Sequence, residues 1–204
     1  MVKVLVFDLG NVLVDFDHTI AAKKIAGCCD KNIKQIYDFF FDSPLTGQFE
    51  EGRISPREFF SQVSLELNMR LTYEVFLPVW NEIFVQSEKN RAVYALAKKL
   101  KTSHTIALLS NINILHFEYL KNKIFIFDAF HKIFLSYELK LKKPDPLIYK
   151  RVMSSLGVLP EEVFYTDDRP ELIEAANRLG IKGFVFTGVQ QLKKDLLISG
   201  VDPR

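Results

Sequence analysis

The sequence predicts an α/β fold, in which a doubly wound parallel sheet carries a small helical cap inserted after its first strand. Through most of the chain, short apolar runs alternate with amphipathic helical patterns. Alternation of this kind is typical of parallel sheets whose strands are buried on both faces. It breaks once, between the first and second apolar runs, where about 70 residues show helical patterns only.

The predicted strands are apolar runs of four to six residues, rich in Val, Ile and Phe. They are Val2–Phe7, Thr105–Leu109, Lys132–Leu135, Val163–Thr166 and Gly183–Phe186. Helical patterns follow at Lys89–Leu100, Pro146–Leu156 and Glu171–Leu179. Gly180 comes directly after the last of them, and glycine commonly ends a helix in the left-handed conformation. One sheet with helices on both faces is the expected result.

Residues 17–86 are predicted to form the helical cap, while residues 1–16 and 87–204 form the α/β core. Ser55-Pro56-Arg57-Glu58 has the pattern of a helix start, with a capping serine, a proline at the first helical position and a glutamate that reaches back. A connection of this length is far longer than an ordinary crossover between parallel strands. The alternative is a set of extra helices packed on the sheet.

The composition excludes several classes of protein. Hydrophobic residues make up 48% and charged residues 25% of the 204 residues, as in globular rather than disordered chains. A net charge of +2 does not predict a nucleic-acid or membrane-surface partner. The apolar runs are too short for a signal peptide or a membrane span. Adjacent Cys28 and Cys29 offer no disulfide framework. We expect a cytoplasmic protein, monomeric or weakly self-associating, that binds a small molecule.

Polar residues suited to catalysis follow the predicted strands, at the edge where an open parallel sheet binds its ligands. They are Asp8 after the first strand, Ser110 and Asn111 after the second, Lys143 ahead of the helix at Pro146, and Asp167 and Asp168 after the fourth. Each one alone has a plainer explanation, such as a helix cap or a solvated lysine run. Together, carboxylates from two strands can hold Mg²⁺, and a hydroxyl with an ammonium group can bind phosphate.

On these residues the sequence resembles the haloacid dehalogenase superfamily of hydrolases, whose core is Rossmann-like, and all four motifs of that superfamily occur in order. Asp8-Leu9-Gly10-Asn11-Val12 and Gly52-Arg53-Ile54-Ser55 are similar to the sugar-phosphatase subgroup that includes glucose-1-phosphate phosphatase. The resemblance implies a Mg²⁺-dependent phosphatase. Its substrate would be a small phosphate monoester, a sugar phosphate, and the reaction would pass through an aspartyl-phosphate intermediate.

The resemblance also implies a role for each residue. Asp8 would be the nucleophile, Ser110 and the amide of Asn111 would bind phosphoryl oxygens, and Lys143 would neutralise charge. The metal ligands would be Asp8, the carbonyl of Gly10, and Asp168, with Asp167 either a further ligand or a neighbour of the ligands. The helical cap would close over this site and select the substrate.

Gly10 departs from the pattern of most phosphatases in the superfamily. They carry a second aspartate two residues after the nucleophile, which serves as general acid and base, although the sugar-phosphatase subgroup shares the glycine. The proton must then come from a water, from a cap side chain, or from Asp15 or Asp17, which lie close in sequence. Without any such acid we expect hexose 1-phosphates to react faster than 6-phosphates, since the anomeric oxygen tolerates charge better.

Two alternatives remain open. A metal-independent dehalogenase-like hydrolase would use the same aspartate, serine and lysine, but within the family it lacks the acidic pair Asp167-Asp168. A non-catalytic member would use the pocket to bind a phosphorylated ligand or a partner protein, and Gly10 keeps this possibility open.

The remaining polar and aromatic residues have simpler interpretations. The histidines show no metal-ligand spacing and are predicted to be surface or internally satisfied groups: His18, His104, His116 and His131. The aromatic residues of the cap are predicted to form its own small core: Phe39-Phe40-Phe41, Phe59-Phe60 and Trp80. Arg53 and Arg57 are the cap charges predicted to contact the substrate.

Overall fold

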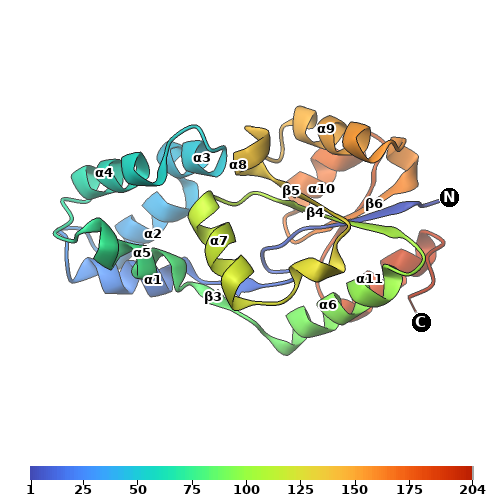
Figure 1. Ribbon diagram of the computed structural model, residues 1–204, viewed down its shortest axis with the longest axis horizontal. Coiled ribbons are helices and arrows are strands. Elements are labelled where there is room, and N and C mark those ends of the chain that lie inside the picture. Colours follow the sequence, from blue (N-terminus) through green and yellow to red (C-terminus); the bar gives the residue numbers. More distant parts are fainter. Residues whose placement is uncertain (204) are drawn as a thin grey trace.

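The computed structural model describes residues 1–203, apart from the side chain of Asp42, and is built around a five-stranded parallel sheet. The strands are β1 (Val4–Phe7), β4 (Thr105–Ser110), β5 (Lys132–Leu135), β6 (Val163–Asp167) and β7 (Lys182–Val185), in the order β5-β4-β1-β6-β7. Every neighbouring pair is parallel. Because β1 is central, with β4 and β6 on either side, the residues that follow these three strands meet at one edge (Figure 1).

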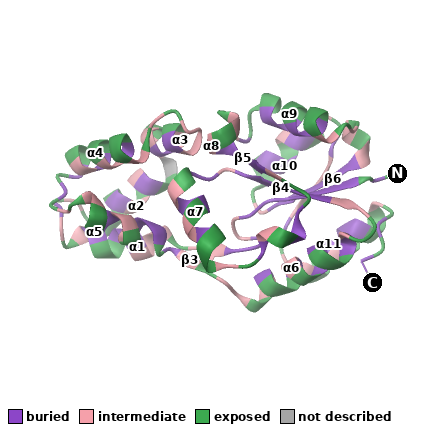
Figure 2. Cartoon of the chain, in the orientation of Figure 1, coloured by how far each residue is buried: buried purple, intermediate pink, exposed green. Residues whose placement is uncertain are grey.

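Helices cover both faces of the sheet (Figure 1). On one face pack α6 (Glu88–Leu100), α7 (Ile114–Lys123) and α11 (Val189–Ile198), and on the other α9 (Pro146–Leu156) and α10 (Pro170–Asn177). Alternate residues of β1 enter the two apolar clusters, Leu5 with Phe7 and Val4 with Val6. All four are buried (Figure 2), so the strand reads as a continuous apolar run. The predicted doubly wound α/β fold is confirmed.

Most boundaries agree with the sequence-based prediction to within two residues. β5 and α9 coincide with it, whereas β1 begins two residues later and α10 ends two residues earlier. β7 is displaced by one residue towards the N-terminus relative to the predicted run. Gly180 has a φ of 85°, the left-handed conformation expected beyond a helix end.

Residues 17–86, called the helical lobe below, lie beside the sheet and have an apolar cluster of their own (Figure 1). Their helices are α1 (His18–Ala26), α2 (Ile33–Asp42), α3 (Pro44–Glu50), α4 (Pro56–Glu66) and α5 (Tyr73–Asn81). The cluster is centred on fully buried aromatic rings: Phe40, Phe49, Phe59, Phe76 and Trp80. At the start of α4, Ser55 and Glu58 form the predicted reciprocal cap.

A short antiparallel pair of strands that the sequence did not reveal lies at the base of the helical lobe. β2 (Asp15–Phe16) pairs antiparallel with β3 (Phe84–Val85), where the chain enters and leaves the lobe. A two-residue strand is too short to show any periodicity.

Shorter elements complete the core, namely α8 (Ser136–Leu139) and 3₁₀ turns at Phe127–Ala129 and Pro160–Glu162. None of the described helices has the length and apolar character needed to cross a bilayer.

Candidate active site

Three carboxylates gather at the carboxyl edge of the sheet. Asp8 follows β1, Asp167 ends β6 and Asp168 comes next. Phe7 lies opposite Thr166 in the β1–β6 register, and the Asp8 amide donates to the Thr166 carbonyl at 3.0 Å. One oxygen from each of the three carboxylates lies within 4.8 Å of the others. Parallel register alone therefore brings together charges that are almost 160 residues apart.

Lys143 joins this cluster from the loop ahead of α9. Its Nζ donates to Asp8 Oδ1 at 2.7 Å, to Asp167 Oδ2 at 2.6 Å and to the Leu109 carbonyl at 3.1 Å. The side chain is 1% exposed. Burial opposes the charge of Lys143, but Asp167 and Asp8 hold its pKa above the ordinary value. Burial raises the pKa of Asp8, against the contact with Lys143, which lowers it.

Asp167 and Asp168 have different surroundings. Both oxygens of Asp167 are occupied, because Oδ2 also accepts from the Tyr165 hydroxyl and Oδ1 accepts from the Arg169 amide at 3.0 Å. Asp167 is fully buried, whereas Asp168 is only half-buried. Asn11 donates to Asp168 Oδ2 at 2.8 Å. Asp167 is thus arranged to hold Lys143, while the more exposed Asp168 contacts Asn11.

Ser110 and Asn111 lie at the end of β4, next to β1. Ser110 is buried. Asn111 holds the backbone of Lys143 in place, since its Nδ2 donates to the Lys143 carbonyl and its Oδ1 accepts from the Lys143 amide, both at 2.8 Å. The loop that carries the lysine is therefore fixed relative to the loop that carries the serine.

A cavity of about 70 Å³ lies between this sheet edge and the helical lobe. At the sheet edge its wall is formed by Gly10, Ser110 and Asn111. The rest of the wall, called the lobe side below, combines residues of the helical lobe with core residues that lie next to it, among them His116 of α7: Leu9, Val14, Phe16, His18, Thr46, Glu50, Trp80, Ile83, Phe84, Ile112, Asn113 and His116. The cavity thus has a polar side at the sheet and a mostly apolar lobe side that includes aromatic rings.

His116 and His18 belong to this wall, which the sequence did not indicate. His116 stacks on Trp80 with ring centroids 4.7 Å apart, and its ring nitrogens contact the Trp80 carbonyl at 3.0 Å and Asn113 Nδ2 at 3.1 Å. Nδ1 of His18 is buried and has no hydrogen-bond partner within residues 1–203, contrary to the prediction of a surface or satisfied group. Burial lowers the pKa of His116 to about 3 and that of His18 to about 4, so both rings are neutral.

The other histidines and aromatic residues lie mostly as predicted. Ser103 contacts His104, and the Ile106 amide donates to His131. Phe39, Phe40, Phe59 and Phe60 pack in the lobe cluster. Phe41 is an exception, since it is 49% exposed and stacks on Tyr37. Trp80 packs in the cluster and also lines the cavity.

Glu50, at the end of α3, is a second cavity residue that the sequence did not indicate. The Ser136 hydroxyl donates to its carbonyl at 2.6 Å, and Lys142 Nζ lies 3.9 Å from its Oε2. Burial raises the pKa of the Glu50 carboxyl, while the positive charges of Lys142, Arg169 and Lys143 lower it in part. Nothing in the surrounding sequence, Glu-Glu-Gly-Arg-Ile-Ser, indicates that this glutamate lines a cavity.

Gly10 lies close to Phe16. A Cβ at position 10 would stand 2.8 Å from Cε1 of the Phe16 ring. That ring packs edge-on against His18 and Phe84, with centroids 5.3 Å and 6.5 Å away. The absence of a side chain at Gly10 is therefore what allows the Phe16 ring to pack this close to the backbone two residues after Asp8.

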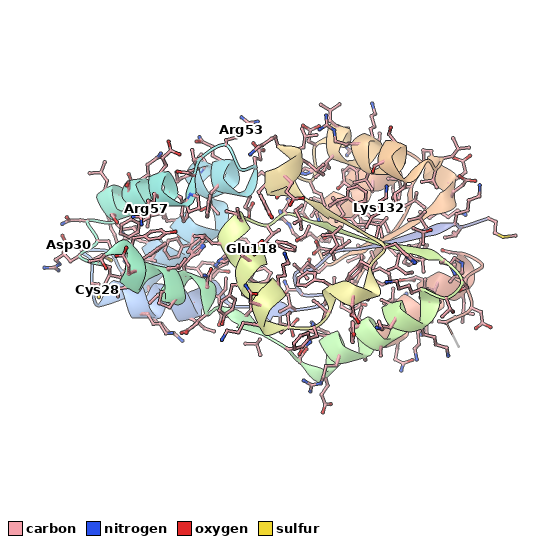
Figure 3. The ribbon with its side chains drawn as sticks, viewed as in Figure 1. Cys28, Asp30, Arg53, Arg57, Glu118 and Lys132 are labelled. Atoms are coloured by element: carbon pink, nitrogen blue, oxygen red, sulfur yellow. The ribbon has the colours of Figure 1, made fainter. Side chains whose placement is uncertain are left out.

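Four residues considered from the sequence lie away from the cavity. Asp15 binds Lys89 at 2.6 Å, and Asp17 caps α1 through Thr19. Arg53 pairs with Glu51 at 2.5 Å, and Arg57 stacks on Tyr73. The side chains of Arg53 and Arg57 are 63% and 76% exposed and do not line the cavity (Figure 3). The substrate contact of these arginines therefore stays a prediction that the cavity lining does not support, because the charge of an exposed residue does not reveal which side of a lobe it occupies.

Comparison with known proteins gives a consistent result. The chain is 29% identical over 192 residues to D-ribitol-5-phosphate phosphatase of Bacteroides thetaiotaomicron, across 90% of this chain and 91% of that protein. A haloacid dehalogenase (HAD) family enzyme from the same organism has a similar structure, with a TM-score of 0.84, 27% identity, and coverage of 95% and 97% of the two chains.

A solved structure of a HAD family enzyme from Bacteroides thetaiotaomicron in complex with magnesium and inorganic phosphate matches with a TM-score of 0.79 and 28% identity. It covers 91% of this chain and 94% of its own. A family model, that of the haloacid dehalogenase-like hydrolases, matches residues 2–180. With this match spanning most of the sequence and the ordered strand-end motifs behind it, the chain belongs to the haloacid dehalogenase-like hydrolases.

Proposed function

We propose that this chain is a Mg²⁺-dependent phosphatase that hydrolyses a sugar phosphate, or a similar small phosphate monoester, through an aspartyl-phosphate on Asp8. The observation that carries the proposal is the buried contact of Lys143 with both Asp8 and Asp167, beside a cavity lined by Ser110 and Asn111. A carboxylate attacks an anionic ester only where positive charge and hydrogen-bond donors offset the repulsion.

Each residue of the site has a separate role in phosphoryl transfer. A carboxylate oxygen of Asp8 attacks phosphorus, and Lys143 offsets the negative charge of nucleophile and phosphate together. The Ser110 hydroxyl and the Asn111 amide donate to the phosphoryl oxygens, and Asn111 also keeps Lys143 in position through its two backbone contacts. Phosphoryl transfer depends mainly on positioning and charge stabilisation, which these groups provide.

The carboxylate cluster fits a magnesium ion. Its donors are hard oxygens within 4.8 Å of one another, and Asp168 is the most exposed of the three carboxylates. Asp8, Asp168 and the Gly10 carbonyl would hold the ion, with Asp167 as a further ligand or as the residue that positions Lys143. Bound magnesium would supply additional positive charge to the phosphate.

The substrate class and the cap rest on the lobe side of the cavity. D-ribitol-5-phosphate phosphatase, a relative along most of the chain, acts on a phosphorylated sugar alcohol according to its name. Aromatic faces with a few polar groups suit the C–H faces and hydroxyls of such a molecule. We propose that residues 17–86 act as a cap, with residues 1–16 and 87–204 as the core, and that the cap selects this part of the substrate.

A panel of sugar phosphates, nucleotides and 2-halo acids, assayed with Mg²⁺ and with EDTA, tests the proposal. Phosphate release that requires Mg²⁺ is expected, together with a loss of several orders of magnitude in Asp8→Asn. Asp17→Asn is the matched control, because asparagine also caps helices well and position 17 lies outside the cavity. Halide release without metal would favour the dehalogenase alternative, and no turnover at all would favour a binding protein.

A further inference from the structure

If Asp8 forms an aspartyl-phosphate, as proposed above, the leaving oxygen needs a proton that Gly10 has no side chain to give. The donor must reach the cavity, since the leaving group occupies it. Asp15 and Asp17, the nearby carboxylates in sequence, are bound to Lys89 and Thr19 outside the cavity. A side chain that donates this proton therefore has to belong to the cavity wall.

The described residues that line the cavity include only three with titratable side chains: His18, Glu50 and His116. Both nitrogens of His116 are in contact with protein groups, and its ring is neutral. His18 is neutral as well. A neutral imidazole is a very weak acid, so neither histidine can donate a proton to a departing alkoxide. Glu50 is the remaining candidate.

The position of Glu50 is fixed from the core as well as from its own helix. Ser136 Oγ donates to the Glu50 carbonyl and also accepts from the Ile112 amide at 2.9 Å. Ile112 follows directly after Ser110 and Asn111. One hydroxyl therefore links the backbone of Glu50, the last residue of α3, to the segment that would bind the phosphoryl group, and Glu50 lines the same cavity as Ser110 and Asn111.

The surroundings of Glu50 suit proton exchange. Its side chain is 28% exposed, and burial raises the pKa of the carboxyl above its ordinary value. Lys142, Arg169 and Lys143 act against this rise, and Glu51 adds to it. A two-step phosphatase requires a group that acts first as acid and then as base, and a raised pKa favours the acid form that the first step needs.

We propose that Glu50 is the general acid and base of this enzyme and takes the place of the aspartate absent at Gly10. In the first step Asp8 forms a bond to phosphorus while the bond from phosphorus to the leaving oxygen breaks. The Glu50 carboxyl gives its proton to that oxygen, which leaves as the alcohol. In the second step the Glu50 carboxylate takes a proton from water as the water oxygen attacks phosphorus. The bond from phosphorus to Asp8 then breaks and inorganic phosphate leaves.

The test compares Glu50→Gln with Glu51→Gln, a matched change of the neighbouring carboxylate, which pairs with exposed Arg53. With Mg²⁺ present, kcat/KM is measured for aryl phosphates of graded leaving-group acidity and for a hexose 6-phosphate. Glu50→Gln should lower kcat/KM on the hexose 6-phosphate about 10²–10⁴-fold and on p-nitrophenyl phosphate far less. In the wild type, where Glu50 protonates the leaving oxygen, kcat/KM should depend only weakly on leaving-group acidity. Glu51→Gln should retain this weak dependence.

A second measurement detects the phosphorylated form of the enzyme. Glu50→Gln lacks the base of the second step, so intact-mass analysis during turnover of p-nitrophenyl phosphate should find phosphorylated protein that the wild type does not accumulate. An unchanged leaving-group dependence, or an equal loss on every ester, would overturn the assignment of Glu50. That failure is distinct from failure of the proposed function, in which the wild type releases no phosphate or Asp8→Asn remains active.

Discussion

The two sides of the cavity are held in place by different forces. On the sheet side, Lys143 lies between the carboxylates of Asp8 and Asp167, and all three are nearly inaccessible to solvent. On the lobe side, Trp80 stacks on the neutral ring of His116, and close aromatic packing does the positioning. Fixed charge recognises a phosphoryl group in any ester, whereas ring surfaces respond to the shape of the rest of the molecule.

The difference also concerns how each side tolerates change. A buried ion pair that loses one partner leaves an uncompensated charge, which is among the most destabilising changes in a protein. When one aromatic side chain of a packed cluster is shortened, the loss of stability grows with the contact area that is lost, and the remaining rings still pack. Under the proposed function, the sheet side would carry the chemistry common to all phosphate esters, and the lobe side would select among them. Four measurements separate these two modes of stabilisation.

The largest effect on stability is expected for Lys143→Met. Asp8 and Asp167 would face each other without a counter-charge, so the free energy of unfolding in EDTA at pH 7 should fall by about 3–5 kcal/mol. Urea denaturation measures the change. Lys98→Met serves as control because its pair with Asp128 is largely exposed, and its effect should stay below about 1 kcal/mol. Equal losses in the two variants would contradict the contrast.

The second largest loss of stability is expected for Trp80→Leu. Trp80 is fully buried and contacts the rings of Phe40, Phe59, Phe76 and His116. Removing the indole should lower the free energy of unfolding by about 2–3 kcal/mol. It should also change the relative KM values of different phosphate esters more than their kcat values. Phe125→Leu, at a ring that is 89% exposed, is the control and should change stability by at most about 0.5 kcal/mol.

Acid should weaken the lobe side through its histidines. The pKa values of His116 and His18 in the folded chain are about 3 and 4, below the ordinary value of 6.5. The unfolded chain thus binds protons first as pH falls below 6.5, and stability declines from there towards the folded pKa values. Between pH 7 and pH 5 each ring should account for about 1–2 kcal/mol.

The variant His116→Gln separates this contribution from that of the carboxylates. The fall in unfolding free energy between pH 7 and pH 5 should be smaller in His116→Gln than in the wild type. His104→Gln, which alters a histidine away from the cavity, should retain the wild-type fall. A His116→Gln protein with an unchanged pH dependence would show that this ring is not held neutral by its burial.

The smallest effect on stability is expected for Asp168→Ala, on the rim of the sheet side. Its carboxylate is only half-buried and accepts one bond from Asn11, so the free energy of unfolding in EDTA should fall by no more than about 1 kcal/mol. Calorimetric titration should nevertheless show Mg²⁺ affinity reduced at least about tenfold. Glu171→Ala, an exposed carboxylate paired with Arg169, is the control. Wild-type affinity in Asp168→Ala would remove this residue from the metal site.

The sheet side could be predicted from the sequence because it depends on local order. Buried parallel strands have a recognisable composition, and residues directly after them share an edge whatever the loops do. Asp8, Ser110 and Asp167 therefore lie where the strand pattern places them. Lys143 could be named from its place ahead of the helix at Pro146, but nothing in a run of lysines indicates which one is buried, and its role came from the resemblance to a family.

The lobe side could not be predicted in the same way. Whether His18, Glu50 and His116 meet depends on how α1, α3 and α7 pack against one another, and no periodicity encodes that. The antiparallel pair β2–β3 was missed because each strand has two residues. Arg53 and Arg57 were given a substrate contact on the basis of charge alone, and both face solvent.

The closeness of Gly10 to Phe16 restricts how this sequence can evolve. An aspartate at position 10, as in most phosphatases of the superfamily, would need the Phe16 ring to move out of its contacts with His18 and Phe84. The cost of Gly10→Asp therefore depends on which residue stands at position 16, so we expect the two positions to be epistatic. A smaller residue at position 16 would make room for the new side chain, and Gly10 is easier to keep where Phe16 is kept. If Glu50 is the proton donor, the choice of that donor is linked to the aromatic contact at position 16.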